Sequence, residues 1–239
     1  QGLAPEGIYY QNIFQTGYVL GRYEEGIFKK DPGNFQELDR GFEFYAPQSF
    51  QMPDGRTLLM GWMGTMPKEK EETMPTNEEG WAHHLSILRE VTVEEGILYQ
   101  RPVKELAAYF QEEARFQGRC YQGEFEKVLK VTLSTKERFQ DVFELSLDEH
   151  TIFTVQEGIA TLTRIAWNTG EKETRSCVLS KGLQSLSCYL DGTSLELFLN
   201  DGEEVFSSRV FFQKKYVQLK VVAKEDYELL VYSFQESQV

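Results

Sequence analysis

The chain has 239 residues, enough for one large domain or two ordinary ones, and we expect two. Its 38 acidic and 25 basic residues give a formal charge of −13 and a pI near 4.8, so a nucleic-acid partner would be repelled and is not expected. No apolar run approaches the ~20 residues that a membrane helix needs, so the composition predicts a soluble protein with no membrane partner.

Apolar and polar residues alternate with a period of two along the first hundred residues, which is the pattern of half-buried strands. Turn sequences such as Pro53-Asp54-Gly55 and Glu94-Glu95-Gly96 separate the runs. Lys30-Asp31-Pro32 also belongs to a turn, with glycine and asparagine following it. The pattern predicts an antiparallel meander with strands at 7–14, 18–24, 43–50, 56–63 and 84–93.

Two segments interrupt this alternation. Residues 66–80, MPKEKEETMPTNEEG, are charged and rich in proline and threonine, so we expect an exposed loop there. Residues 101–116, RPVKELAAYFQEEARF, would place four apolar side chains on one face of a helix and a proline in its first turn. The second segment therefore predicts a short helical linker between two β domains.

After residue 116 the period returns to two. About nine short strands follow in about 120 residues, with Asp191-Gly192 and Asp201-Gly202 as turns, and this spacing is typical of a β-sandwich. The sequence thus predicts an all-β protein. Its expected parts are a first β domain at 1–101, the helical linker at 102–116 and the β-sandwich at 117–239.

Common catalytic and metal-binding patterns are not found in the sequence: it has no GxSxG, P-loop or GxGxxG. Cys120, Cys177 and Cys188 form no CxxC pair, so we expect buried free thiols in a reducing compartment. His83 and His84 are adjacent, and on a strand they would point to opposite faces, which prevents joint metal ligation. We expect no metal and no other cofactor.

The stretch 37–50, ELDRGFEFYAPQSF, sets two carboxylates beside aromatic residues. Glu43 and Tyr45 would share one face of a strand, while Asp39 precedes a turn. An acid next to an aromatic ring is a typical sugar-site composition, because carboxylates accept hydrogen bonds from hydroxyls and the ring covers the apolar C–H patch. The same composition occurs on solvated strands, so the pattern alone leaves both readings open.

Five motifs follow one another along the chain: YVLGRYEEGIF (18–28), LDRGFEFYAPQSF (38–50), DGRTLLMGWMG (54–64), GWAHHLSILREVTVEEGILYQRPVKEL (80–106) and DGTSLELFLNDGEEVFSSRVFF (191–212). In this order they resemble the carboxyl-terminal half of glycoside hydrolase family 32, and within it they most resemble bacterial sucrose-6-phosphate hydrolases, which are relatives of invertase. The resemblance implies the last blades of a five-bladed β-propeller, followed by a short helical linker and a β-sandwich. It also implies a cytoplasmic enzyme of sucrose metabolism that cleaves the β-fructofuranosyl bond of sucrose 6-phosphate or sucrose with retention.

The family places its catalytic residues in asparagine-aspartate-proline-asparagine-glycine, arginine-aspartate-proline and glutamate-cysteine-proline motifs, and none of these occurs here. The resemblance therefore implies a fragment with no catalytic residue of its own that is inactive alone. It places Asp39, Glu43 and Tyr45 on the wall of the sugar pocket and Trp62 at its rim. For Arg89 we expect an internal ion pair.

Two further expectations concern partners. A propeller that lacks its early blades exposes an unpaired strand edge, which would favour a homo-oligomer. The alternative function is a stand-alone carbohydrate-binding or protein-interaction β module without catalysis.

Overall fold

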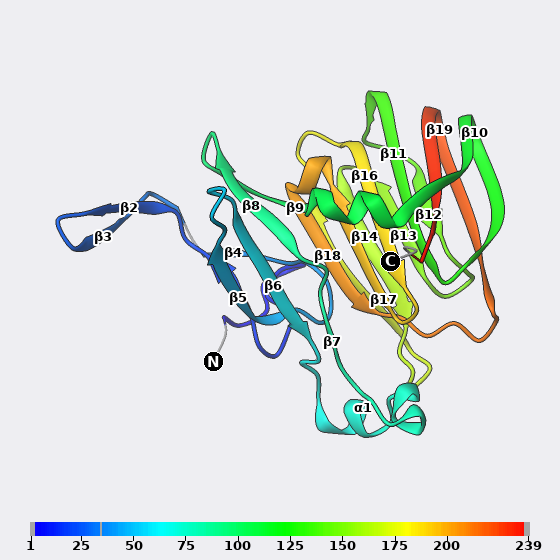
Figure 1. Cartoon of the computed structure of the whole chain (residues 1–239), viewed down its shortest axis with the longest axis horizontal. Coiled ribbons are helices and arrows are strands. Elements are labelled where there is room, and N and C mark those ends of the chain that lie inside the picture. Colours follow the sequence, from blue (N-terminus) through cyan, green and yellow to red (C-terminus); the bar gives the residue numbers. More distant parts are fainter. Residues whose placement is uncertain (1–2, 34, 237–239) are drawn as a thin grey trace.

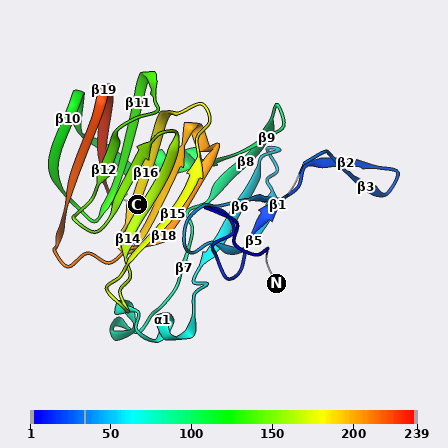
Figure 2. The same ribbon diagram turned by 180° about the vertical axis from the view of Figure 1, so that it is seen from behind.

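The computed structural model describes residues 3–33 and 35–236, and it is built mainly of β-strands (Figure 1). Strands β1 to β9 lie on one side of the molecule and strands β10 to β19 on the other, in both views (Figures 1 and 2). The all-β prediction is confirmed. The amino-terminal strands are β1 (Gly17–Tyr18), β2 (Gly21–Glu24), β3 (Ile27–Lys30), β4 (Gln36–Glu37), β5 (Tyr45–Gln51), β6 (Thr57–Met63), β7 (His84–Leu85), β8 (Arg89–Glu94) and β9 (Ile97–Pro102).

The amino-terminal part contains an antiparallel sheet of order β5-β6-β8-β9, with β7 added to β6. The hairpin β2–β3 projects away from this sheet (Figure 1). The predicted strand at 7–14 is wrong, because only an isolated bridge between Glu6 and Tyr9 forms there. Side-chain contacts fix this segment instead: the Gln15 amide donates to the carbonyl of Tyr10, and the backbone N–H of Tyr10 donates to Glu37.

The charged segment 66–80 is not a strand, as predicted, but it is more ordered than a solvated loop. It forms helix α1 (Lys68–Glu72) and the 3₁₀ helix η1 (Pro75–Glu79). Met74 and Lys70 are buried. Lys70 Nζ lies 2.6 Å from Glu173, and this ion pair holds the segment 66–80 against the second half of the chain.

The predicted linker helix is wrong over most of its length. Only the 3₁₀ helix η2 (Lys104–Tyr109) forms, and strand β10 begins at Phe110. From its first residue β10 pairs antiparallel with β19, starting at Phe110 opposite Phe234. The helical spacing of these apolar residues was a local signal, and pairing with a strand more than a hundred residues away overrides it.

The second half of the chain forms ten strands in the order β15-β14-β13-β12-β19-β11-β16-β17-β18, with β10 joined to β19. Two predicted strands merge into β19, whose first half pairs with β12 and whose second half pairs with β11. The bounds are β10 (Phe110–Glu126), β11 (Val128–Phe139), β12 (Phe143–Ser146), β13 (Ile152–Gln156), β14 (Ile159–Ile165), β15 (Lys172–Val178), β16 (Leu183–Asp191), β17 (Ser194–Leu199), the 3₁₀ helix η3 (Asn200–Gly202), β18 (Glu204–Arg209) and β19 (Tyr216–Phe234).

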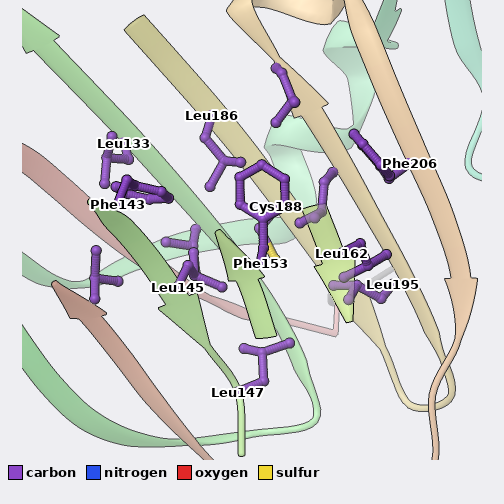
Figure 3. Close-up of a cluster of buried hydrophobic side chains, with 14 of the residues drawn as sticks. Leu133, Phe143, Leu145, Leu147, Phe153, Leu162, Leu186, Cys188, Leu195 and Phe206 are labelled. Carbon is purple, nitrogen blue, oxygen red and sulfur yellow. The ribbon is translucent and has the colours of Figure 1, made fainter. Parts of the chain in front are cut away.

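The principal core lies within this second half, where leucine and phenylalanine side chains from facing strands interdigitate (Figure 3). Phe143, Phe153 and Phe206 form a continuous series of edge-to-face ring contacts. Cys177 and Cys188 are buried free thiols, whereas Cys120 is exposed, so the prediction of buried thiols is wrong for that residue. Cys120 lies on β10, beyond the residues 110–116 of that strand that were predicted to be helical.

Candidate functional site

Aromatic side chains meet on the β5–β6 ladder. Tyr45 of β5 is the direct cross-strand partner of Trp62 of β6, so the two side chains lie on the same face of the sheet. The Phe14 ring lies 5.3 Å from the Tyr45 ring, and the His83 ring meets Trp62 edge-on at 5.1 Å. We call Phe14, Tyr45, Trp62 and His83 the aromatic row.

The aromatic row is suited to contact with a sugar. Tyr45, Trp62 and His83 are half-buried and Phe14 is exposed, so the rings are fixed by packing yet remain accessible. An aromatic face can cover the C–H patch of a sugar ring, while the tyrosine hydroxyl can hydrogen-bond to sugar hydroxyls. His83 Nε2 also lies 2.9 Å from Glu71 Oε1, and this contact links the aromatic row to the segment 66–80.

Asp39 lies in a buried contact with the second half of the chain. Its carboxylate is 2% exposed, and one oxygen accepts hydrogen bonds from the backbone N–H groups of Gly41 and Ser207 at 2.8 and 2.9 Å. The other oxygen accepts from the Ser207 hydroxyl at 2.7 Å and from Arg89 at 3.1 Å. Gly41 is required here, because a Cβ on it would lie 1.9 Å from the Ser207 carbonyl oxygen.

Arg89 is the centre of this contact, and the prediction of an internal ion pair is confirmed. The guanidinium is fully buried, and Nη2 lies 2.6 Å from Glu196 Oε2 on β17. Gln100 accepts from Nη1 at 2.9 Å. Burial raises the pKa of Glu196 although the Arg89 charge opposes the shift. We call Asp39, Arg89, Gln100, Glu196 and Ser207 the Arg89 cluster.

Glu43 lies in a second buried contact. Both of its oxygens accept from Arg164 of β14, at 2.6 and 2.7 Å, and one also accepts from the backbone N–H of Arg209 at 2.9 Å. Arg164 donates further to Glu173, which pairs with Lys70. Burial would raise the pKa of Glu173, but Arg164 and Lys70 outweigh it and lower the pKa. We call Glu43, Arg164, Glu173 and Lys70, whose charges alternate, the Arg164 cluster.

The four predicted site residues therefore lie in two different surroundings. Tyr45 and Trp62 come together in the aromatic row, whereas Asp39 and Glu43 are held by arginines between the two halves of the chain. The expected shared face of Glu43 and Tyr45 is not formed, because β5 begins only at Tyr45 and strand alternation does not extend back to Glu43.

Arg164 and Glu196 were not among the residues predicted for the site. A usable signal was present: Arg164 falls in the inward register of β14, with Ala160 and Leu162, where a charged side chain requires a buried partner. Glu196 likewise lies within β17, in which every residue is buried.

His83 and His84 point to different surroundings, as predicted. His84 Nε2 lies 3.0 Å from the Thr193 hydroxyl, and its ring meets Trp81 edge-on. Burial and the nearby Arg209 charge lower the pKa of His84, against an opposing effect of Asp191.

A pH dependence follows from His84. Because its pKa is lower in the folded chain than in the unfolded chain, the unfolded state takes up the proton first as the pH falls through about 6.5. We expect wild-type stability to decrease from pH 7.5 to pH 5 more steeply than that of His84→Gln, measured by urea unfolding. Equal slopes for the two proteins would contradict the assignment.

Residues 3–33 and 35–236 contain neither a metal-binding cluster nor a membrane-spanning helix. Within those residues no group of three or more histidine, cysteine or carboxylate side chains could hold a metal ion. No helix in that part of the chain has the length and apolar character to cross a membrane.

Comparison with known proteins identifies the family. Residues 2–102 match the model described as the glycosyl hydrolases family 32 N-terminal domain, and residues 132–236 match the family 32 C terminal. The chain belongs to glycoside hydrolase family 32. The sucrose-6-phosphate hydrolase of Staphylococcus xylosus is 34% identical over 92% of this chain, and that of Klebsiella pneumoniae is 38% identical over 88%. The family 32 chain spans 47% and 44% of these two relatives.

Solved family 32 structures have the same fold. The Bombyx mori beta-fructofuranosidase superposes with a TM-score of 0.81 at 28% identity, covering 99% of this family 32 chain and 50% of the silkworm protein. A mutant of that silkworm protein has been solved in complex with sucrose. The sucrose-6-phosphate hydrolase of Lactobacillus gasseri superposes with a TM-score of 0.77 over 95% of this chain and 49% of its own.

Proposed function

We propose that this chain is the carboxyl-terminal part of a glycosidase that hydrolyses the β-fructofuranosyl bond of sucrose 6-phosphate or sucrose. The observation that carries the proposal is the Tyr45–Trp62 pair, an accessible aromatic surface in a chain that belongs to family 32. Curated relatives that match most of the chain are named sucrose-6-phosphate hydrolases. A cytoplasmic location is part of the proposal, supported by the buried free thiols Cys177 and Cys188.

The proposed architecture assigns residues 1–101 to the last blades of a five-bladed β-propeller, 102–116 to the linker and 117–239 to the β-sandwich. In a propeller, loops from all blades contribute to one site around the central axis. This chain would supply the aromatic row as one wall of that site. The remaining wall and the catalytic groups would come from the part of the relatives that this chain does not span.

The chemistry explains why the two conspicuous acids are not proposed as catalysts. Retaining hydrolysis needs a carboxylate nucleophile and a carboxylic acid about 5–5.5 Å apart, both free to react with the sugar. Asp39 is saturated by donors from Gly41, Ser207 and Arg89, and Glu43 is held in a two-point contact by Arg164. We propose that both position the wall and do not react.

Hydrolysis assays test this proposal. The purified 239-residue chain is expected to release no reducing sugar from sucrose 6-phosphate or sucrose above the blank. Fused after the amino-terminal half of the Staphylococcus xylosus relative, it is expected to hydrolyse sucrose 6-phosphate, and Trp62→Ala should lower kcat/KM of the fusion about tenfold or more through lost stacking. Turnover by the chain alone that Glu43→Gln or Asp39→Asn abolishes would overturn the assignment of roles.

Self-association is a second part of the proposal. Strand β5 is an edge of its sheet, and the β2–β3 hairpin projects away from that sheet (Figure 1). On the hairpin, Tyr23 is 75% exposed and Ile27 is 63% exposed. An isolated two-stranded hairpin with apolar side chains gains stability by pairing with a further strand. We expect concentration-dependent dimers or larger species in light scattering after size exclusion, and a shift toward monomer for Tyr23→Lys with Ile27→Lys. A monomer at all concentrations would contradict this expectation.

A further inference from the structure

A cavity of about 850 Å³ lies at one end of the sandwich, and no member of the aromatic row lines it. Three connections meet there: the turn between β12 and β13, the turn between β14 and β15, and the segment between β18 and β19. Its volume is within the usual range for ligand sites of about 300–1,000 Å³. Connecting segments at the end of a sandwich are also common binding positions, because the strands fix their bases. We call it the loop-end cavity.

The floor of the loop-end cavity is a polar row on three neighbouring strands. Lys220 of β19 pairs with Ser146 of β12 on one side and with Gln122 of β10 on the other, so the three side chains share one face. All three line the cavity. Lys220 and Gln122 are exposed, and together the row offers ammonium, amide and hydroxyl groups that donate or accept hydrogen bonds.

The wall of the loop-end cavity is aromatic. Trp167 and Phe211 meet edge-on at 5.0 Å, and Phe212 and Tyr216 continue the wall. Two hydrogen bonds fix this wall in advance of any ligand: the Trp167 indole N–H donates to the Lys70 carbonyl at 2.9 Å, and Lys127 Nζ donates to the Phe212 carbonyl at 2.9 Å. A pre-formed wall reduces the ordering cost of binding.

The charges around the loop-end cavity favour a neutral ligand. The exposed cations of its lining are Lys214 and Lys220, and the lining also holds the carboxylates of Glu144, Asp148 and Glu149. Two arginines of the lining, Arg164 and Arg209, are buried and donate to groups of the protein itself. Because side chains of both signs line the cavity, they favour neither an anionic nor a cationic ligand. The formal charge of −13 on the whole chain also disfavours an anionic ligand. Rings beside a row of hydrogen-bonding side chains suit a ligand that has both C–H faces and hydroxyls. We propose that the loop-end cavity is a second carbohydrate-binding site, which takes a neutral oligosaccharide.

Calorimetric titration of the 239-residue chain tests the proposal, with 1-kestose as a neutral fructosyl trisaccharide and maltotriose as a glucosyl one. The choice of a fructosyl probe rests on the proposed function, whereas the site rests on the cavity alone. We expect Tyr216→Ala and Lys220→Ala each to weaken binding by about tenfold. The matched control Lys224→Ala removes another exposed lysine of β19 that does not line the cavity, and it should stay within about twofold of wild type.

Further outcomes distinguish binding at the loop-end cavity from binding at the aromatic row. Trp62→Ala should leave binding at the loop-end cavity intact, so loss of binding in Trp62→Ala with retention in Lys220→Ala would overturn the proposal. The absence of binding heat with both trisaccharides at millimolar concentration would also overturn it. Binding of maltotriose alone would support the cavity and argue against a fructosyl preference, while the proposed hydrolysis is judged separately by release of reducing sugar. Matching thermal unfolding of all variants confirms that each is folded.

Discussion

Replacing Arg89 by methionine is expected to lower the free energy of unfolding by about 3–5 kcal/mol, the range for removing one partner of a buried ion pair. Methionine fills much of the space that the arginine occupied, so the loss is mainly electrostatic. Two buried carboxylates, Asp39 and Glu196, would then face each other without a cation between them. Urea unfolding followed by tryptophan fluorescence measures the change.

Two control variants test whether loss of the Arg89 charge causes the loss of stability. Arg22 is exposed on the β2–β3 hairpin, so Arg22→Met is expected to stay within about 0.5 kcal/mol of wild type. The triple variant Arg89→Met, Asp39→Asn, Glu196→Gln removes the uncompensated charges, and it should be more stable than Arg89→Met alone by about 1 kcal/mol or more. If Arg89→Met were no less stable than Arg22→Met, the Arg89 cluster would not hold the two halves together.

Replacing Arg164 by methionine is expected to cost about 3–5 kcal/mol as well, because Glu43 would lose its two-point partner in a buried contact. The same change leaves Glu173 with Lys70 alone and removes the Arg164 donation to the Arg209 carbonyl at 2.9 Å. This contact links the segment before β5 to the sandwich, so its loss should also weaken the coupling between the two halves. We expect one calorimetric transition in wild type and a broadened or double transition in Arg164→Met.

The control for Arg164 is an arginine of the same half on the surface. Arg115 pairs with Glu112 and Glu228 with its side chain 57% exposed, and Arg115→Met should change stability by less than about 1 kcal/mol. A double-mutant cycle of Arg164→Met with Glu43→Gln should show strong coupling, since each change removes the same contact. Additive effects of the two changes would contradict a direct role for this pair.

The Arg89 and Arg164 clusters attach the segment before β5 to the second half of the chain. Asp39 and Glu43 lie at either side of Phe42, just before Tyr45 begins β5, and both are held by arginine-containing clusters that include sandwich residues. The second half of the chain therefore fixes the backbone that leads into the aromatic row. In the proposed function, this is how a part of the chain without a catalytic motif contributes to the shape of the sugar site.

The sequence by itself determined the features that depend on local pattern. Strict alternation predicted β6 at 56–63 within about a residue, and turn pairs such as Asp191-Gly192 correctly separated β16 from β17. The ordered motifs were sufficient to identify the family. These signals are local, because a strand's period and a turn's glycine are properties of a few consecutive residues.

Only the tertiary structure decided where the charged side chains lie. Glu43 meets Arg164 from 121 positions along the chain, and Asp39 meets Ser207 from 168 positions away. The segment 110–116 is a strand because β19 lies beside it, despite apolar spacing that also fits a helix. A buried carboxylate and a solvated one look alike in the sequence, since the difference lies in the donors that surround it, and long-range pairing of the strands brings those donors together.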